Sequence, residues 1–281
     1  MWNQIKTVLL LGILTAILLF IGSFFGRVGL TIALIFVLGM NLITYFFSDK
    51  IALMIYRANE IKKDDKKWLH DLVNEVAKKA GIPKPKGIYL IPTQTPNAFC
   101  TGRSKNHYVV AYTQGILDLL NKEELKGVTA HEVSHAKNRD ILVTTIAATI
   151  AGVISYLASM ARWGAIFGGS NDRNSSANIV GLLILSILAP LAAVVIQLAI
   201  SRSREYLADS TGAKTIQNSE ALASALVKLH SGVKNHPMTF GNPTYSSLFI
   251  VNPFSARGLI NLFMTHPPME ERVKRLKAMK F

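Results

Sequence analysis

The sequence predicts a mainly α protein in which a small α+β domain is combined with four transmembrane α-helices. Two observations lead to this fold class: four long stretches contain no charged side chain, and a polar segment rich in Lys and Arg follows each pair of them. A helix needs about 20 apolar residues to cross the hydrocarbon layer of a membrane, and each stretch is close to that length. Half of the chain is hydrophobic and its mean hydropathy is +0.30, which is more apolar than a soluble domain requires.

The first pair of uncharged stretches covers residues 7–25 and 28–47, with Gly26-Arg27 as the break between them. A cleaved signal peptide is the alternative for the first stretch. No A-x-A-like cleavage site follows it, however, and the second stretch begins at once. Residues 1–48 are therefore predicted to form an amino-terminal transmembrane hairpin.

Residues 49–140 are predicted to be the first part of the α+β domain. Residues 51–80 have helical periodicity, and Gly81-Ile82-Pro83 ends the pattern. Runs rich in β-branched and aromatic residues predict strands over residues 87–91 and 107–113. Residues rich in turn formers predict loops over residues 92–96 and 101–104. A helix is expected from about Asn121 onward.

The second pair of uncharged stretches covers residues 141–160 and 179–200, so residues 141–200 are predicted to form a second hairpin. Core helices of a soluble protein are the alternative, but both stretches are long enough to span a membrane and neither has an amphipathic stripe. None of the four stretches contains Asp, Glu, Lys, Arg or His. This composition disfavours an ion-coupled transporter, which needs ionisable groups at membrane depth.

The positive charges indicate an orientation. Of the 31 Lys and Arg residues, 16 lie in residues 48–140 and 11 in residues 201–281. By the positive-inside rule these two segments, and with them both termini, are cytoplasmic. Nucleic-acid binding is the competing explanation of a net charge of +14, but the charges are spread along the chain and no recognition motif accompanies them. We therefore expect a lipid bilayer and no nucleic acid as partner.

The motif His131-Glu132-Val133-Ser134-His135 lies in the predicted helix that precedes the third stretch. Residues four apart share one face of a helix, so both histidines can direct a ring nitrogen at one metal ion. Zinc with three protein ligands keeps a fourth position for water, and Glu132 is then placed to take a proton from that water. Surface or capping histidines beside a glutamate are the alternative.

A third ligand is expected at Glu205, in residues 201–281. Glu205 lies just beyond the fourth stretch and His135 just before the third, so an antiparallel pair of helices brings them level outside the bilayer. Asp209, one turn further on, can accept a hydrogen bond from the second ring nitrogen of a ligating histidine. Salt bridges to nearby arginines are the alternative for both carboxylates.

These motifs resemble those of the HtpX-type membrane zinc metalloproteases, relatives of the CaaX prenyl endopeptidases. The resemblance covers essentially the whole chain. It includes the motif at 131–135 with Asp140, the run Ser201-Arg202-Ser203-Arg204-Glu205-Tyr206-Leu207-Ala208-Asp209, Pro96-Asn97-Ala98-Phe99, Thr265-His266-Pro267-Pro268 and Glu270-Glu271-Arg272. Cys100 departs from the small residue expected after Asn-Ala-Phe.

The resemblance implies a zincin-like catalytic domain with one Zn²⁺ per chain, held by His131, His135 and Glu205, and Glu132 as the catalytic residue. It also implies a zinc metalloendopeptidase of a prokaryotic inner membrane that cleaves damaged or misassembled membrane proteins. This is a role in protein quality control and stress response. The substrates and the oligomeric state stay open.

Further roles follow as hypotheses with alternatives. His266, which is followed by two prolines, is a candidate hydrogen-bond donor to the oxyanion of the tetrahedral intermediate. A surface histidine in a turn is the alternative. Asn97, Ala98 and Phe99 are predicted to form an exposed strand edge to which a substrate adds as an extra strand. An ordinary buried strand end is the alternative. Residues 231–259, rich in Gly, Pro, Asn and Ser, are expected to cover the cleft as a lid.

Three other functions compete with the zinc metalloprotease assignment. A protease embedded within the membrane would have an apolar motif helix, whereas Lys126, Lys137 and Arg139 surround the motif here. A scaffold with structural zinc would need a fourth protein ligand, for which His266 is the candidate. A cysteine nucleophile would pair Cys100, the single cysteine, with His107.

Overall fold

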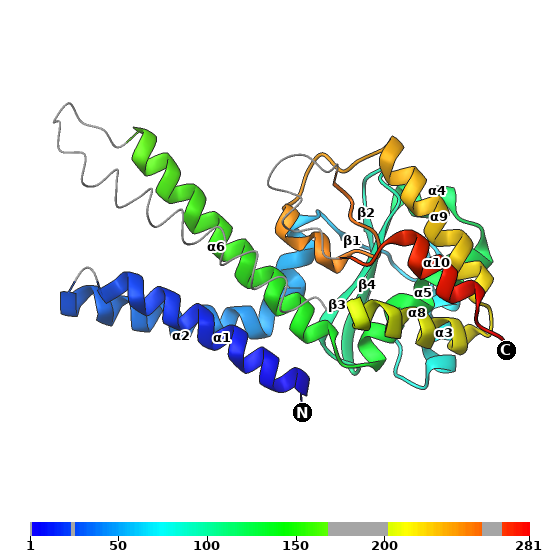
Figure 1. Cartoon of the computed structure of the whole chain (residues 1–281), viewed down its shortest axis with the longest axis horizontal. Coiled ribbons are helices and arrows are strands. Elements are labelled where there is room, and N and C mark those ends of the chain that lie inside the picture. Colours follow the sequence, from blue (N-terminus) through cyan, green and yellow to red (C-terminus); the bar gives the residue numbers. More distant parts are fainter. Residues whose placement is uncertain (1, 24–25, 168–201, 255–265) are drawn as a thin grey trace.

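A computed structural model describes residues 2–23, 26–167, 202–254 and 266–281. Figure 1 shows a globular domain from which long helices project to one side. The projecting helices are α1 (Trp2–Ser23), α2 (Gly26–Ile55) and α6 (Ile141–Phe167). The fourth predicted stretch, residues 179–200, lies outside the described residues. The coarse prediction of a mainly helical chain with a smaller sheet is confirmed.

The globular domain contains a four-stranded sheet in the order β1-β2-β4-β3. Its strands are β1 (Asn59–Glu60), β2 (Ile88–Ile91), β3 (Ala98–Ser104) and β4 (His107–Thr113). β2 and β4 are parallel, and the other neighbours are antiparallel. The predicted loop at residues 101–104 is wrong, because these residues continue β3 and pair with β4 as far as the turn before His107.

Helices surround this sheet. They are α3 (Lys67–Ala80), α4 (Gln114–Leu119), α5 (Lys122–Lys137), α8 (Arg202–Ile216), α9 (Ser219–Asn235) and α10 (Met269–Lys277), with a 3-10 helix η1 (Pro243–Leu248). α5 packs against β3, α3, α8 and α9, so it lies at the centre of the domain. The single helix predicted over residues 51–80 is wrong, because the chain leaves α2 through Arg57, with φ +53°, and forms β1 before α3 begins.

The start of α5 is fixed by a capping box. The Asn121 side chain accepts a hydrogen bond from the backbone N–H of Glu124, and the Glu124 carboxylate accepts one from the N–H of Asn121. Glu124 also accepts hydrogen bonds from Ser224 and Lys228 of α9, at 2.7 and 2.8 Å. The motif helix is therefore anchored at its beginning to the helix packed against it.

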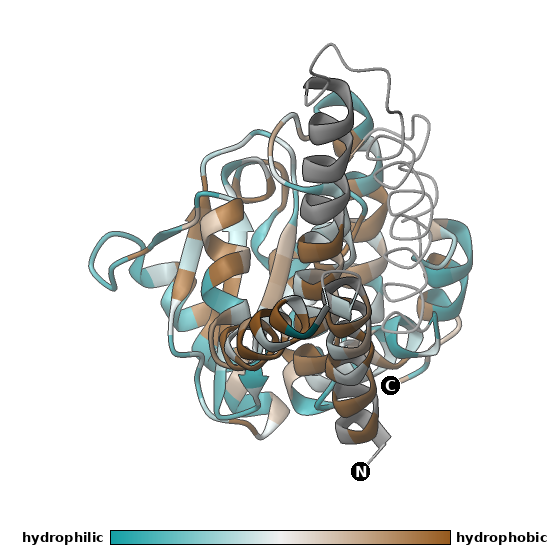
Figure 2. Cartoon of the chain, turned by 90° about the vertical axis from the view of Figure 1, so that its left-hand side faces the viewer, coloured by the Kyte–Doolittle hydropathy of each residue, from teal (hydrophilic) through white to brown (hydrophobic). Residues whose placement is uncertain are grey.

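Among the described residues one helix, α2, is long and apolar enough to cross a membrane. Most of its large side chains are exposed, for example Val28 at 72%, Ile35 at 68% and Leu42 at 60%, whereas Val37 and Thr44 are buried. Figure 2 shows the hydrophobic colouring of the projecting helices α1, α2 and α6, called here the apolar arm. Exposed apolar surface of this extent is stable in lipid rather than in water. Asn41 of α2 donates a hydrogen bond of 2.9 Å to Thr15 of α1, a contact that joins the two helices.

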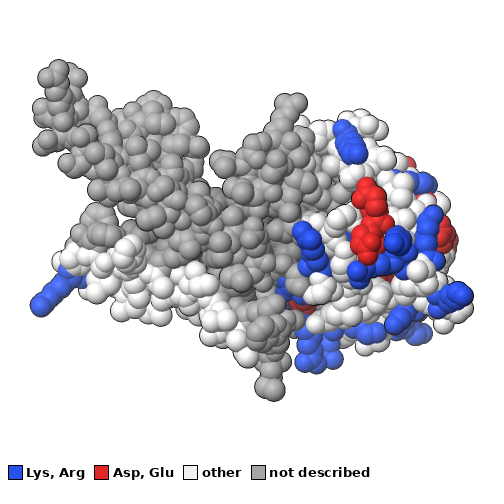
Figure 3. Space-filling view, in the orientation of Figure 1, with Lys and Arg blue, Asp and Glu red and all other residues white. Residues whose placement is uncertain are grey.

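The charged and uncharged parts of the molecule are separated. In Figure 3 Lys, Arg, Asp and Glu gather on the globular domain, whereas the described surface of the arm is almost entirely white. α2 connects the two parts, because Ala52 and Leu53 near its end, together with Tyr56, are buried in a core cluster with Phe99 and Phe249. The apolar arm and the globular domain thus share one core.

Candidate active site

The two motif histidines lie on one face of α5 and direct their Nε2 atoms toward each other at 3.1 Å. His131 is fully buried, and the His135 side chain is 17% exposed. α5 is buried along most of its length because β3, α3, α8 and α9 pack against it. The site is therefore a largely dry pocket in which charged groups act strongly on one another.

Glu205 of α8 completes a group of three possible metal ligands with the histidines. Its carboxylate oxygens lie 3.7 Å from Nε2 of His131 and 3.8 Å from Nε2 of His135. Ligands about 2.1 Å from a tetrahedral zinc ion are about 3.4 Å apart, close to these separations. α8 approaches closely at Gly212, where an added Cβ would lie 2.8 Å from the backbone nitrogen of His131.

Each histidine has a carboxylate at its other ring nitrogen. Nδ1 of His131 lies 2.9 Å from Asp209, and Nδ1 of His135 lies 3.2 Å from Asp140. A carboxylate in this place keeps the proton on Nδ1 and leaves Nε2 free to bind a metal. The structure thus places Asp209 where the sequence predicted, and it adds Asp140 in the same position for the second histidine.

Arg272 of α10 holds Asp209 in place. Its guanidinium donates two hydrogen bonds of 2.8 Å to the two oxygens of Asp209 and a third of 2.8 Å to the carbonyl of Ile250. Arg272 is only 1% exposed, so this is a buried, bidentate ion pair. No role for Arg272 was inferred from the sequence. It is 63 residues from Asp209, and no spacing rule connects the two.

Burial and opposite charges set the pKa values of this site. Burial raises the pKa of Glu132 to about 8. Burial acts to lower the pKa of His135, but Asp140, Glu205 and Glu132 outweigh it and raise that pKa to about 10. Burial also acts to raise the pKa of Asp209, but Arg272 beside it holds that pKa well below its usual range. The carboxylates of the site therefore favour a positive charge at His135.

Unpartnered oxygen atoms test whether a metal fits. Within the described part of the chain, both carboxylate oxygens of Glu132 and one of Glu205 are buried without a hydrogen-bond partner. Such groups are costly unless something binds them. A divalent cation held by the three ligands would satisfy the Glu205 oxygen and favour the neutral form of His135, and a water could bind to Glu132. The residues therefore fit a metal centre.

His266 lies at the same site but is already engaged. Its Nε2 is 2.7 Å from the carbonyl oxygen of Phe249, and burial lowers its pKa. Asn97, Ala98 and Phe99 are not exposed but fully buried, as in the alternative of a buried strand end, and Phe249 forms an antiparallel bridge with Phe99. The strand edge is present, but another part of the chain covers it.

The alternative nucleophile receives no support from the geometry. Cys100 is buried, and burial raises the pKa of its thiol well above the usual range. Cys100 is opposite Val110 on β4, whereas His107 is opposite Ser104 at the other end of the hairpin. The two side chains are thus separated along the strand pair.

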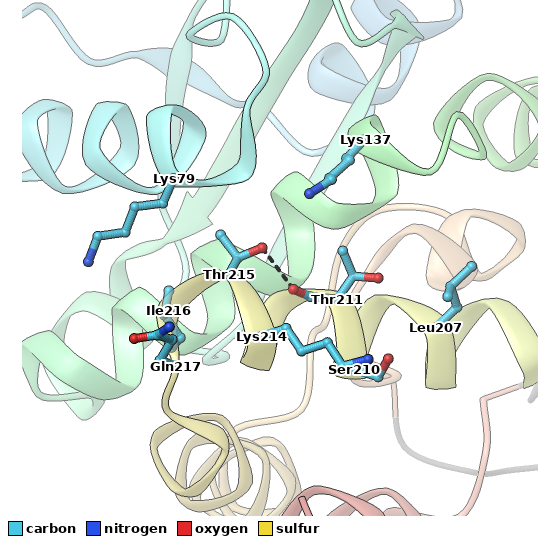
Figure 4. A pocket seen from close by; sticks show the side chains of 9 residues that line it. All are labelled: Lys79, Lys137, Leu207, Ser210, Thr211, Lys214, Thr215, Ile216 and Gln217. Atoms are coloured by element: carbon cyan, nitrogen blue, oxygen red, sulfur yellow. Dashed lines mark hydrogen bonds between the residues drawn. The ribbon is translucent and has the colours of Figure 1, made fainter. Parts of the chain in front are cut away.

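A second hollow, of about 620 Å³, lies between α8, α3 and the end of α5 (Figure 4). Lys79, Lys137 and Lys214 line it together with hydroxyl side chains, and Thr215 donates a hydrogen bond to the backbone of Thr211 within it. The carboxylates of α8 that belong to the metal site are not among its lining residues. This hollow is therefore separate from the candidate active site.

One helix, α5, provides a His-x-x-x-His pair, and a second helix, α8, provides a carboxylate. An unpartnered glutamate lies beside them. This is the arrangement of a metallopeptidase active site. The chain matches the model of peptidase family M48 over residues 63–280 and belongs to that family. It is 52% identical over 279 residues to a Protease HtpX homolog of Desulfatibacillum aliphaticivorans, covering 98% of this chain and 89% of the relative. It is thus an HtpX-type membrane metalloprotease, as the motifs predicted.

Other relatives agree. A Protease HtpX homolog of Persephonella marina is 52% identical over 281 residues, covering 99% of this chain and 97% of the relative. The solved structure of Ste24p from S. mikatae has a TM-score of 0.52 and 19% identity, covering 98% of this chain. This chain spans 65% of that Ste24p chain, and the likeness concerns the fold alone.

Proposed function

We propose that this metalloprotease is a zinc-dependent endopeptidase that cuts unfolded or misassembled membrane proteins at the cytoplasmic face of a prokaryotic inner membrane, as part of stress-linked quality control. The observation that carries the proposal is the convergence of His131, His135 and Glu205 beside the unpartnered carboxylate of Glu132. Three protein ligands leave a fourth position for water, as in catalytic zinc sites.

The residues of this chain divide the chemistry between them. Zinc held by the three ligands would lower the pKa of a bound water toward about 7. Glu132 would take a proton from the attacking water and pass it to the leaving amine. A carboxyl whose pKa is raised by burial can both accept and release a proton near neutrality. His266 would donate to the oxyanion once its ring nitrogen is released from Phe249.

The membrane orientation is part of the same proposal. Four spans place both basic segments, residues 49–140 and 201–281, on one side, and the positive-inside rule makes that side cytoplasmic. The exposed apolar surface of α2 and the charged surface of the globular domain support this arrangement. The active site then faces protein segments that emerge from the bilayer on the cytoplasmic side.

A structural zinc site is the competing function. It would need four protein ligands, and His266 was the candidate for the fourth. Its Nε2 is instead hydrogen-bonded to a backbone carbonyl, which favours a site with three ligands and an open position.

The test is to purify the chain in detergent and to compare it with Glu132→Gln, measuring zinc content and the cleavage of casein and of an unfolded membrane protein. We expect one zinc ion per chain in both proteins and a rate about 10² to 10⁴ times lower in Glu132→Gln, because a general base contributes a factor of this size. If both proteins bind zinc and neither cuts either substrate, a structural zinc site is the better assignment.

A further inference from the structure

The edge of β3 beside the metal site is covered by residues 247–251, called here the covering segment. Phe249 forms an antiparallel bridge with Phe99, and the N–H of Ile250 donates to the carbonyl of Ala98 at 3.2 Å. The contact is a single bridge and not a continuous strand, so a short piece of chain is paired with the free edge of the sheet.

The Asn97 side chain extends this pairing by one residue. Its amide nitrogen donates to the carbonyl of Val251 at 2.7 Å, and its amide oxygen accepts from the N–H of Val251 at 3.5 Å. Both bonds go to main-chain atoms, so they require an extended chain at this place and not a particular side chain. Any extended peptide on this edge of β3 can make the same bonds.

The covering segment also lies beside the metal ligands. The carbonyl of Phe249 is bound by His266 at 2.7 Å, where a peptide carbonyl would meet an oxyanion donor. Four residues of the segment, Ser247 to Ile250, line the remaining cavity beside His135 and Glu205, which measures about 20 Å³. A single water needs about 10–15 Å³, so this cavity holds about one water and no peptide.

We propose that the covering segment is an internal strand in the place of the substrate, and that cleavage requires its displacement from β3. This inference rests on the proposed function. A substrate that displaces the segment restores the same main-chain hydrogen bonds, so one strand is exchanged for another. The favoured substrates are extended polypeptides, which fits unfolded proteins and excludes folded ones.

The place of the Phe249 ring adds a preference for a side chain. The ring packs edge to face against Tyr56 at 4.8 Å and against Phe99 at 5.1 Å between ring centroids. When the segment leaves, an aromatic-lined site becomes vacant beside the strand edge. A large apolar side chain of the substrate fills it best, and membrane-protein segments are rich in such side chains.

Cys100, the single cysteine, gives a readout that does not depend on activity. It is 5% exposed and lines the small cavity together with Phe249 and Ile250. Phe249→Ala should loosen the covering segment, so maleimide should label the native-state thiol at least tenfold faster and casein cleavage should rise severalfold. Phe240→Ala, which removes a ring packed against the same cluster outside the segment, is the matched control and should change neither rate.

Unchanged labelling and cleavage in Phe249→Ala, or cleavage that falls while zinc stays bound, would overturn the inference. Faster labelling with no cleavage by the variant or by the native chain supports a displaceable segment and counts against the proposed function instead. The two failures are therefore distinguishable.

A reversible cross-link tests the need for displacement within one protein. Because Ile250 donates the hydrogen bond, Phe99 and Phe249 are a non-hydrogen-bonded pair, with Cα atoms about 4.5 Å apart, a separation that a disulfide can bridge. Phe99→Cys with Phe249→Cys is made in a Cys100→Ala background and oxidised with diamide. The oxidised form should cut at least tenfold more slowly than the same protein after reduction with a phosphine.

The control for oxidation is Phe249→Cys with Cys100→Ala, which has no partner thiol within the chain and should not respond to diamide. Equal rates in the oxidised and reduced double-cysteine protein would show that the segment need not move. A reduced protein that binds zinc and stays as inactive as the oxidised form also contradicts the inference, because freeing the segment would not have opened the site.

Discussion

The buried pair of Arg272 and Asp209 offers a prediction that separates burial from ion pairing. Arg272 and Arg275 are one turn apart on α10, and each donates to a carboxylate at 2.7–2.8 Å. Arg272 is 1% exposed, whereas the Arg275 side chain is 55% exposed. Replacing each by Met removes an arginine from the same helix in two different environments.

Arg272→Met should lower the free energy of unfolding by about 3–5 kcal/mol, because Asp209 is left as a buried charge without its partner. For a domain of about 150–250 residues, this corresponds to a fall of about 6–20 °C in Tm. Arg275→Met should lower Tm much less, because the exposed carboxylate of Glu271 is solvated by water once the arginine is gone. Thermal unfolding of the metal-free proteins in detergent measures both effects.

The same pair should affect metal binding. Asp209 orients His131, and loss of such a supporting carboxylate or of its anchor weakens metal binding by about 10–100-fold. A competition titration against a zinc chelator measures this change. Adding Asp209→Leu to Arg272→Met removes the stranded charge, so it should restore part of the stability without restoring zinc affinity. Equal falls in Tm for the two arginine variants would refute the argument from burial.

Three further predictions concern the metal site and the helices that carry it. Asp140→Asn should weaken zinc binding about 10–100-fold in a chelator titration, because Nδ1 of His135 loses its carboxylate, while Tm of the metal-free protein changes little. Gly212→Ala should lower both Tm and zinc affinity, since its Cβ would push α8 from α5, whereas Gly39→Ala, with nothing within 4 Å, should lower neither. Glu124→Gln should cost about 1–3 kcal/mol near neutral pH. Burial acts to raise the pKa of Glu124, but hydrogen bonds from Lys228, Ser224 and the Asn121 backbone outweigh it and lower that pKa. The contribution of Glu124 to stability is therefore present above the unfolded pKa of about 4.3 and is lost as pH falls through the folded pKa. The difference in Tm between the native chain and Glu124→Gln should shrink over that pH range.

The parts of the site that the sequence could predict are those set by local geometry or by topology. The spacing of His131 and His135 follows from the helical repeat, and the capping signal at Asn121 fixes where that helix begins. The proximity of Glu205 was predicted from two uncharged stretches that were expected to return the chain to its starting side. The position of Asp209 then follows from one further helical turn.

What the sequence could not predict depends on contacts between distant segments. Thr101 to Ser104 have the composition of a loop, but pairing with β4 overrides that local preference. The break after α2 has no Gly or Pro to mark it, because a non-glycine residue, Arg57, adopts the left-handed conformation. The cover on Asn97 to Phe99 comes from about 150 residues away, and hydrophobic periodicity does not encode such a pairing.

The continuity of α2 has a consequence for how substrates are met. Its 30 residues extend about 45 Å, about 15 Å more than the hydrocarbon thickness of a bilayer, and its last turns are buried in the core that holds Phe99 and Phe249. If α2 spans the bilayer, as we propose, the catalytic centre is held at a fixed height above the lipid surface. The enzyme and the proposed membrane-protein substrates would then meet in a plane and not in a volume, which raises their effective concentration without any additional contact.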